Sequence, residues 1–405
     1  MKSRGNDVRV SPMAPSTFHV RRTAGIGAAL LLCLVASTRG QAPDRIADAS
    51  TRVLSPHQWQ RVDASVSRAL EWLAAQQEAD GSFPTLDTGQ PGVTCLCMLA
   101  FMAHGHLPGE GPYGEHLKRA GEYALSCQKP NGLVTLVGPD GPTISRAIVH
   151  EIGVTTAYNH GISALTLSEL YGMRSADTVR LKNAITPALG ATLEMQRWPK
   201  DRQIDHGGWR YIDNFDDKDS DLSITGWQLK FLRSARNAGF DVPEESIDDA
   251  VAYVRRTFTP RYGAFCYAAD EHLDFRSRGM AGAGILALAH AGHHNAPEAT
   301  RSGEWILQHH FHDYNQIEPF LQSWKNDRYH YGLFNCCQAM YQLGGSYWQQ
   351  FFPGAATTLL QNQLPDGSWP AENHHHDAQF GNAYTTALAL LTLGAPNQLL
   401  PIYQR

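Results

Sequence analysis

The stretch Asp366-Gly-Ser-Trp369-Pro370 near the end of the chain repeats Asp80-Gly-Ser-Phe83-Pro84 near its beginning, and each follows a helix-like segment containing a Gln near its end. Looser copies lie between them, at Asn131-Gly132, at Gly207-Gly208-Trp209 and at Gly263-Ala-Phe265. The interval from Gly263 to Asp366 is about double the interval from Asp80 to Asn131, so one degenerate repeat lies inside it. Self-similarity at a regular spacing is the signature of a repeat architecture. The sequence therefore predicts an array of six repeats.

Each repeat divides into two helix-like halves. The first half is amphipathic: in 62–77, Val66, Leu70 and Leu73 follow helical spacing while Arg68 and Glu71 face water. The second half is apolar nearly all round, which is typical of a helix that is buried on all sides. These second halves span 93–103, 162–171, 222–235, 280–291, 331–343 and 383–393.

Six buried helices with six amphipathic partners predict an all-α fold, an α/α toroid in which six helical hairpins form an inner barrel inside an outer one. Glycines such as Gly161, Gly226 and Gly282 would let neighbouring inner helices approach closely. An open superhelical solenoid is the competing topology. The sequence favours the closed ring because no polar capping repeat is visible at either end of the array.

Composition indicates one large globular domain behind a targeting segment. The chain has 405 residues, a hydrophobic fraction of 42%, a charged fraction of 18% and a net charge of -5, with no basic stripe that would indicate nucleic acid. Arg21-Arg22 precede the apolar run 24–36 and then small residues, which is the pattern of a secretory signal. We expect a signal peptide over 1–42, a linker over 43–56 and the toroid over 57–405. The protein is then exported and has no transmembrane helix once the signal is removed.

Cysteine and histidine give no clear metal site. The six cysteines that follow Cys33 lack the CxxC spacing of zinc sites and are expected to be small buried residues. Histidines cluster at His293-His294, at His309-His310 and at His374-His375-His376, where solvated loops are the simpler interpretation. The sequence therefore predicts no cofactor.

The repeated element resembles the QW-type repeat of squalene and oxidosqualene cyclases. Gln77-Glu-Ala-Asp80-Gly-Ser-Phe83 and Gln363-Leu-Pro-Asp366-Gly-Ser-Trp369 carry this resemblance, which protein prenyltransferase β subunits share more loosely. The segment 219–228 and the C-terminal segments 384–391 and 400–403 look like the exported bacterial prenyltransferase and squalene oxidase repeat proteins. The resemblance implies the toroid fold. Independently of it, the Gln can hydrogen-bond the next outer helix while the aromatic ring packs between neighbouring hairpins.

In a toroid, the points where the chain enters the inner helices converge on one mouth of the central cavity. These entrances carry a polar ring of carboxylates, histidines, arginines and tyrosines above an apolar barrel, which points to a ligand site. From this ring we predict His330 and Tyr384 as catalytic candidates. The predicted substrate-binding residues are His160, Trp209, Trp227, Arg278, Asp327 and Tyr331.

The resemblance to class II terpene cyclases adds a proton donor. In that family an Asp-x-Asp-Asp motif protonates an alkene or epoxide, and Asp219-Ser-Asp221-Leu222 fits it best, with Leu222 in place of the last carboxylate. This similarity implies Asp221 as proton donor with Asp219 beside it. The competing interpretation is that both carboxylates only cap a helix N-terminus. The other register, 214–217, has Asn214 in place of the first carboxylate.

Zinc enters only through the resemblance to prenyltransferases. Asp327 and His330 are similar to part of their Asp, Cys and His ligand set, but Asp274 has no Cys two residues after it. The resemblance therefore does not imply a bound zinc ion.

Three functions stay open at this point. The chain is a terpene-cyclase-type enzyme acting on an apolar, isoprenoid-like small molecule, a non-catalytic exported binding or scaffold protein, or a glycan-active lyase or hydrolase. A deep aromatic chamber favours the first, a plugged barrel the second, and an open groove with an Arg beside a Tyr the third.

Overall fold

The computed structural model describes residues 53–173, 177–213, 219–269, 276–316 and 327–404. They belong to one compact unit, Arg45–Arg405. The predicted signal peptide over 1–42 and the register 214–217 lie outside the described residues, as does Asp274.

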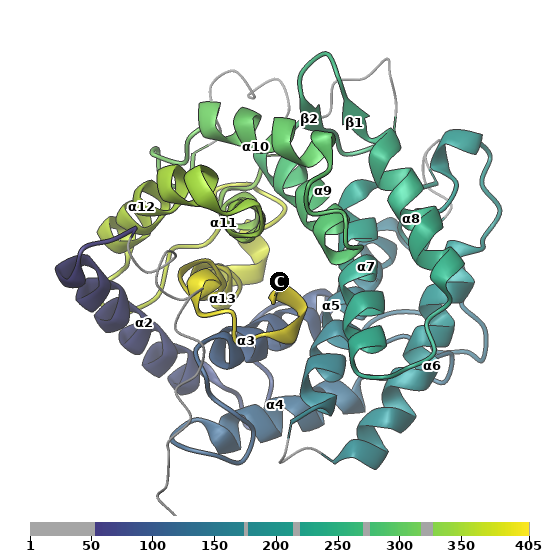
Figure 1. The fold of residues 1–405 in the computed structure, drawn as a ribbon. Coiled ribbons are helices and arrows are strands. Elements are labelled where there is room, and N and C mark those ends of the chain that lie inside the picture. Colours follow the sequence, from purple (N-terminus) through teal and green to yellow (C-terminus); the bar gives the residue numbers. More distant parts are fainter. Residues whose placement is uncertain (1–52, 174–176, 214–218, 270–275, 317–326, 405) are drawn as a thin grey trace, which may run out of the picture. The chain divides into compact units, whose positions relative to one another are not determined.

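Twelve helices in the described residues form six hairpins, each an outer helix followed by an inner one (Figure 1). The outer helices are α2 (Pro56–Gln76), α4 (Gly114–Ser126), α6 (Thr178–Gln196), α8 (Glu244–Arg256), α10 (Pro297–Gln308) and α12 (Gly345–Asn362). The inner helices are α3 (Gly92–Ala103), α5 (His150–Tyr171), α7 (Leu222–Asn237), α9 (Arg278–His290), α11 (Tyr329–Leu343) and α13 (Gly381–Leu393).

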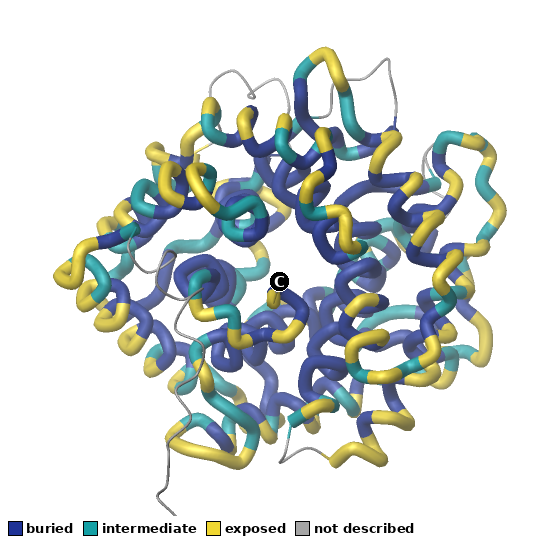
Figure 2. Tube along the Cα trace, in the orientation of Figure 1, coloured by how far each residue is buried: buried dark blue, intermediate teal, exposed yellow. Residues whose placement is uncertain are grey.

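The inner helices close into a ring. Each packs against the next in chain order, and the last, α13, packs against the first, α3, while outer helix α12 packs against α2. Figure 2 shows the inner helices buried and the outer helices exposed on their outward faces. The predicted all-α toroid is confirmed, and the open solenoid is wrong.

Short elements complete the connections. Strands β1 (Phe258–Thr259) and β2 (Ala264–Phe265) pair antiparallel, with Phe258 opposite Phe265. Single 3-10 turns occur at η1 (Asp87–Gly89), η2 (Gln203–Asp205), η4 (Ala378–Phe380), η5 (Ala395–Asn397) and η6 (Pro401–Tyr403).

A glutamine ties each of four outer helices to the following one. Its side-chain amide donates one hydrogen bond to the glycine carbonyl of the turn and another to a backbone carbonyl of the next outer helix. The acceptors are Gly81 and His116 for Gln77 (both 2.9 Å), Gly132 and Ala184 for Gln128 (3.3 and 2.7 Å), Gly207 and Ser246 for Gln196 (2.9 and 2.8 Å), and Gly367 and Ser65 for Gln363 (2.8 and 2.9 Å). The last pair joins α12 to α2 and closes the ring.

The residue that follows each of these turns is bound to the inner helix. A backbone N–H donates to a side chain of that helix in four repeats, and the side chain of the donor residue is buried beneath the hairpin. The pairs are Phe83 with Thr94 (2.9 Å), Val134 with His160 (3.2 Å), Trp209 with Thr225 (3.0 Å) and Trp369 with Thr386 (3.1 Å).

Helix α5 begins at His150, earlier than the predicted start at 162. Its glycines lie at packing contacts and do not end the helix: a Cβ at Gly153 would lie 2.9 Å from the Ile212 carbonyl oxygen. The segment around Tyr158 is therefore inside the helix. The sequence had predicted it at the entrance of the helix, and that prediction is wrong.

Helices α7 and α11 meet through aromatic side chains on the inside of the barrel. Trp227 of α7 stacks on Phe334 of α11, with ring centroids 6.1 Å apart. Helix α9 lies between them in the ring and packs against both. A Cβ at Gly282 of α9 would lie 2.6 Å from the Cys336 amide nitrogen, so this approach needs glycine.

The C-terminal segment lies at the centre of the ring in the view of Figure 1. Leu400, Ile402 and Tyr403 are buried there. The Ile402 amide donates to Glu169 of α5 at 3.2 Å, and Gln342 of α11 donates to the Tyr403 carbonyl. This segment therefore closes the end of the barrel where the inner helices terminate.

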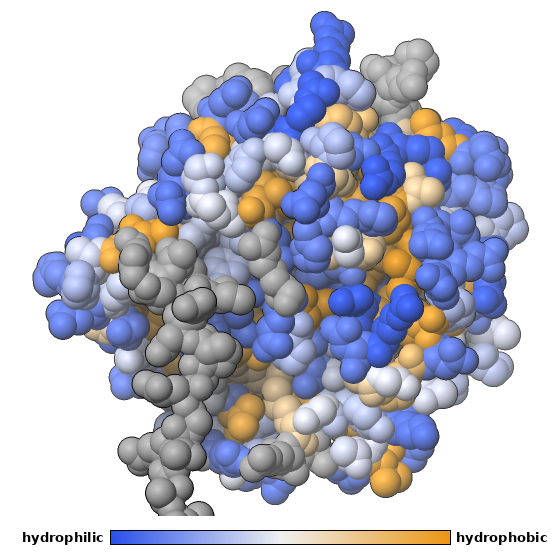
Figure 3. All heavy atoms as spheres, in the orientation of Figure 1, coloured by the Kyte–Doolittle hydropathy of each residue, from blue (hydrophilic) through white to orange (hydrophobic). Residues whose placement is uncertain are grey.

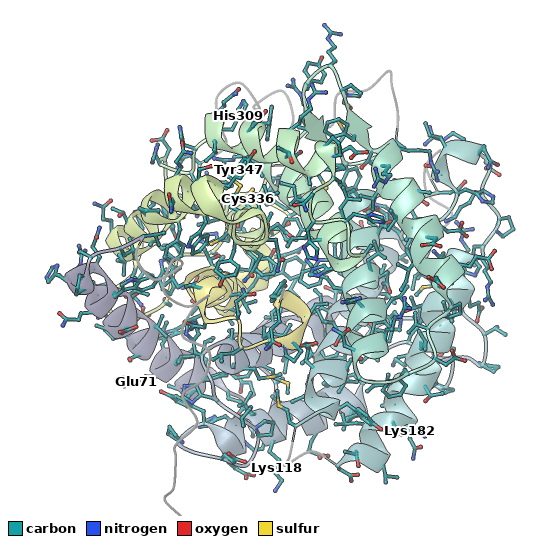
Figure 4. The ribbon with its side chains drawn as sticks, viewed as in Figure 1. Glu71, Lys118, Lys182, His309, Cys336 and Tyr347 are labelled. Atoms are coloured by element: carbon teal, nitrogen blue, oxygen red, sulfur yellow. The ribbon has the colours of Figure 1, made fainter. Side chains whose placement is uncertain are left out.

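The surface agrees with this layering. Hydrophilic residues dominate the outer rim in Figure 3, and hydrophobic residues show through between them nearer the centre. Glu71, Lys118 and Lys182 lie on outer helices and are exposed, whereas Cys336 on α11 is buried (Figure 4). None of the helices in the described part of the chain has the length and apolar character needed to span a bilayer.

Candidate functional site

A chamber of about 540 Å³ occupies the end of the barrel where the inner helices begin. All six contribute to it through residues of their N-terminal halves or immediately before them, together with the segments that lead into α3, α7, α9, α11 and α13. The six inner helices therefore converge on one cavity, as predicted, through the residues that line it. The first turns of α5 extend one wall, since His150, Glu151, Val154 and Thr155 all line the chamber.

The lining has two layers. On five of the inner helices a polar or small residue is followed, about one turn later, by an apolar residue that also lines the chamber, roughly 5–6 Å further along the helix, because an α-helix rises 1.5 Å per residue. The pairs are Gly92 and Leu96, Tyr158 and Ile162, Ser223 and Trp227, Ser277 and Met280, and Tyr384 and Leu388. The upper wall is polar and the floor is apolar.

Three hydroxyl groups form a chain across the upper wall. Tyr158 donates to the Ser223 oxygen at 2.9 Å, and the Ser223 and Tyr331 oxygens lie 2.9 Å apart. Burial raises the pKa of Tyr331 to about 12, and burial with the neighbouring Tyr211 and Asp221 raises the pKa of Tyr158 well above its usual value. At neutral pH both side chains are uncharged phenols that can donate or accept hydrogen bonds.

A buried ion pair supports one side of this wall. Arg210 donates to the Asp221 carboxylate at 2.8 Å and to the Tyr267 hydroxyl at 2.6 Å, and its guanidinium carbon lies 3.9 Å from the Tyr211 ring centroid. Asp221 also caps α7 by accepting from the Ile224 amide at 2.8 Å. Burial raises the pKa of Asp221, while Arg210 and the Ile224 amide lower it.

A second ion pair contributes another part of the wall. Arg328, just before α11, donates to Asp377 at 2.8 Å, and the Tyr384 hydroxyl lies 3.4 Å from the same carboxylate. Arg328, Asp377 and Tyr384 all line the chamber, as does His376.

His150 adds a titratable group at the wall. Its Nδ1 lies 2.6 Å from the carboxylate of buried Asp213. Such a contact fixes the tautomer and orientation of an imidazole and assigns proton exchange to Nε2.

Three of the predicted site residues line the chamber: Trp227, Tyr331 and Tyr384. Asp221 lies directly behind the lining, through its contact with Arg210. Asp219 is not among the lining residues; its carboxylate accepts a hydrogen bond from the Asp201 amide at 2.7 Å.

Two predicted substrate-binding residues lie between hairpin layers. His160 accepts from the Val134 amide and its Nε2 lies 2.9 Å from the Thr192 hydroxyl, so it occupies the place that Thr94, Thr225 and Thr386 occupy in other repeats. Trp209 donates to the Thr192 carbonyl at 2.8 Å. Neither lines the chamber.

The remaining three predicted residues lie near the start of α9 and α11, outside the lining. Arg278 forms a buried ion pair with Asp327 at 2.7 Å and also donates to the His310 carbonyl. His330 has Nδ1 2.8 Å from Glu372 and Nε2 3.0 Å from the Tyr314 hydroxyl. Asp327 and His330 thus have separate partners, and the described residues include no group of three or more His, Cys, Asp or Glu side chains arranged to hold a metal ion.

Sequence reasoning missed Arg210, Tyr211 and Tyr267. Trp209 is in extended backbone, bridged to Asp221, so successive side chains point to opposite faces. Once Trp209 is assigned to the core, this alternation indicates that Arg210 faces the chamber. Alternation does not indicate Tyr211 or Tyr267, because each stands two residues after a buried aromatic residue, Trp209 and Phe265, and still lines the chamber.

No family model matches the chain, and no curated protein matches it. Solved structures do. A variant of the type II terpene cyclase MstE from Scytonema, in complex with merosterolic acid A, aligns at a TM-score of 0.55 and 13% identity, covering 86% of this chain and 100% of the cyclase. A glycosidase variant gives 0.55 and 12% over 86% and 100%, and cellobiose 2-epimerase from Spirochaeta thermophila gives 0.54 and 12% over 86% and 99%. The chain therefore shares the α/α toroid fold with enzymes that act on terpenoids and on sugars.

Proposed function

We propose that this chain is an enzyme whose chamber binds a small amphipathic molecule, with an isoprenoid-like or aromatic part on the floor and an oxygen-bearing end at the upper wall. The two-layer lining is the observation that carries this proposal. Its apolar floor gains from burying carbon surface, and its wall of phenols and Ser223 suits hydroxyl or carbonyl groups. The volume of about 540 Å³ is within the usual range for small-molecule sites, about 300–1,000 Å³.

One protein of the same fold holds a ligand of this kind. A second variant of MstE from Scytonema was solved with its substrate geranylgeranyl dihydroxybenzoate, an isoprenoid attached to a dihydroxybenzoate, and its TM-score against this chain is 0.52. This supports an amphipathic substrate as the first class to test.

The proposed chemistry is proton exchange at a carbon next to the oxygen-bearing end: the imidazole of His150 takes a proton from that carbon and returns one to it. An imidazole that is oriented by a buried carboxylate and faces a ligand chamber suits that role. In this proposal Asp221 positions Arg210 and Tyr267 and does not donate the proton, because its carboxylate lies behind the lining and accepts from Arg210 and the Ile224 amide.

A glycan-active enzyme is the second candidate. Arg210 lies against Tyr211 and bonds Tyr267, so the upper wall offers a charged donor beside aromatic rings, which suits a sugar. The apolar floor favours the amphipathic ligand over this candidate.

Calorimetric titration with farnesol and with cellobiose separates the two. We expect farnesol to bind and Tyr331→Phe, which removes one hydroxyl of the chain across the wall, to weaken it by roughly tenfold. Tyr171→Phe is the matched control, because Tyr171 is at the far end of α5 and outside the lining. Binding of cellobiose alone would favour the sugar candidate, and binding of neither would refute the assignment of the chamber.

Deuterium uptake tests the chemistry. Bound amphiphiles are incubated with enzyme in heavy water and analysed by mass spectrometry for exchange at carbon. We expect His150→Gln to bind with unchanged affinity but to exchange no deuterium. Tight binding without exchange in the wild-type protein would support the binding-protein alternative.

A further inference from the structure

A lysine lies one helical turn below the chamber floor. Lys230 follows Trp227 on α7 by three residues and is 2% exposed. Its ammonium nitrogen lies 4.2 Å from the Trp227 ring centroid and 5.3 Å from that of Phe334, the ring stacked on Trp227. A buried lysine in contact with two aromatic rings is held by their electron-rich faces.

The ammonium group has one polar contact among the described residues. It donates to the Asn335 side-chain oxygen of α11 at 3.3 Å, and it forms no ion pair with a carboxylate of the described residues. An ammonium carries three donors, so most of its charge is offset only by the aromatic faces and by the dipole of Asn335. A positive charge at this depth therefore acts on whatever rests on the floor.

Resting on the proposed function, we propose that Lys230 makes the chamber floor selective, so that it accepts neutral or electron-rich apolar groups and rejects cationic ones. The ammonium polarises the π electrons of Trp227 and Phe334 toward itself. The rings therefore attract a ligand cation on their other side less strongly. The substrate class is thereby narrowed to amphiphiles whose apolar end stays uncharged throughout the reaction. A carbocation delivered to this floor would be repelled.

The size of the effect follows from Coulomb's law. A ligand cation resting on Trp227 would be roughly 8 Å from the lysine nitrogen, which gives on the order of ten- to thirtyfold weaker binding at an effective dielectric constant of about 20. A neutral ligand of the same shape would not be affected by this charge.

The test uses the full-length protein below pH 7, where Lys230 is charged, and two probes of equal shape, phenyltrimethylammonium and tert-butylbenzene, titrated calorimetrically. In the wild-type protein we expect the neutral probe to bind more tightly than the cation. In Lys230→Met the cation should gain about tenfold in affinity while tert-butylbenzene changes by less than about twofold. An unchanged ratio between the two probes would overturn the proposal.

A second variant removes the charge effect without deleting the lysine. Asn335→Asp puts a carboxylate where the amide oxygen now accepts from Lys230, and it should raise the relative affinity for the cation as Lys230→Met does. If Lys230→Met does not fold, this variant decides alone. Failure of tert-butylbenzene to bind any variant would instead refute the chamber assignment, so the two failures are distinguishable.

The pH dependence offers a separate readout. Burial lowers the pKa of Lys230 to about 7, so discrimination against the cation should weaken as pH rises through that value. The titratable groups nearest this layer are His290 of α9, Tyr331 of α11, Tyr403 of the C-terminal segment and Glu169 of α5, and those at the mouth are His150 and His376. All of these persist in Lys230→Met, but burial and then the charge of Lys230 lower the pKa of His290, so a pH effect seen only in the wild type belongs to this pair; an equal effect in both proteins would contradict the assignment.

Discussion

Four turn glycines press against the backbone of the next outer helix. Each has a positive φ, and a Cβ built on it would lie 2.2–2.5 Å from a backbone carbonyl oxygen, far inside van der Waals contact. The positions are Gly81 against Arg119, Gly132 against Pro187, Gly207 against Asp249 and Gly367 against Arg68. Two separate constraints require glycine at each of these positions: the positive φ, and the lack of room for a Cβ beside the neighbouring backbone.

Gly367→Ala should therefore destabilise the protein by roughly 2–5 kcal/mol, the sum of left-handed strain and overpacking against Arg68. Gly190→Ala is the matched control: Gly190 lies within α6, its added Cβ would meet nothing within 4 Å, and the change should stabilise by about 0.5–1 kcal/mol. Urea unfolding measures both. Equal effects of the two changes on the free energy of unfolding would show that the close contact at Gly367 does not contribute to stability.

At the scale of elements, the ring is held shut by the contact between its last and first outer helices. Gln363 at the end of α12 donates to the Ser65 carbonyl of α2 and accepts from the Ser65 hydroxyl at 2.8 Å. No covalent link closes the circle in the described chain, where the six described cysteines are free thiols. The seam therefore depends on side-chain hydrogen bonds and packing.

Gln363→Ala should cost about 1–3 kcal/mol, because it leaves the Ser65 and Gly367 carbonyls without this donor. The loss should be local, with amide hydrogen exchange accelerated in α2 more than in α6. Gln350→Ala on the same helix is the control, since the Gln350 amide donates to Ser346 of its own helix and the change should stay within about 0.5 kcal/mol. Uniform acceleration across all helices would contradict a seam between α12 and α2.

The turns and the helix faces could be predicted because they repeat. The Gln and the Gly of the turn are 4 residues apart in three copies and 11 apart at Gln196 and Gly207, and all four copies make the same hydrogen bonds. The start of α5 could not be predicted, since Gly161 has low helix propensity and indicates a boundary. It is tolerated inside the helix because a Cβ there would lie 3.0–3.1 Å from Gln228 and Trp227, so packing against α7 uses the missing side chain.

At the scale of the whole ring, the sequence could locate the mouth but not assign all of its walls. Trp227, Tyr331 and Tyr384 were predicted from their place near inner-helix starts, and they line the chamber. His160 was also predicted from its place on an inner helix, but its side chain lies between two hairpins. It accepts the turn hydrogen bond that a threonine accepts in three other repeats. Only the superposition of the repeats in the structure reveals that His160 stands in the place of the threonine.

Apart from Glu151 of α5, the charged residues of the chamber lie in connecting segments, whose paths have no periodicity to analyse. Arg210, Tyr267 and Arg328 precede or link helices, and Arg328 pairs with Asp377, a partner distant in sequence. Tertiary packing decides these positions. This is why the sequence predicted that the mouth is polar but identified only some of the residues that line it.

The far end of the ring leads to a prediction about pH. Glu169 of α5 is buried and accepts from Ser234 of α7 and from the Ile402 amide, so one carboxyl joins two inner helices to the C-terminal segment. Burial raises its pKa from 4.5 to about 7, although both hydrogen bonds oppose the shift. The folded state then holds a proton that the unfolded chain has released between these pH values.

The stabilisation from this proton is fully present below pH 4.5 and is lost as pH rises through about 7. The shift corresponds to at most roughly 3 kcal/mol. Glu169→Gln has no charge to bury, so its free energy of unfolding relative to wild type should rise by about 1–3 kcal/mol between about pH 4.5 and 8. Other groups titrate alike in both proteins and cancel in this difference. Parallel pH profiles from urea unfolding would mean that Glu169 is ionised in the folded protein at no cost, and that the C-terminal segment is held by packing alone.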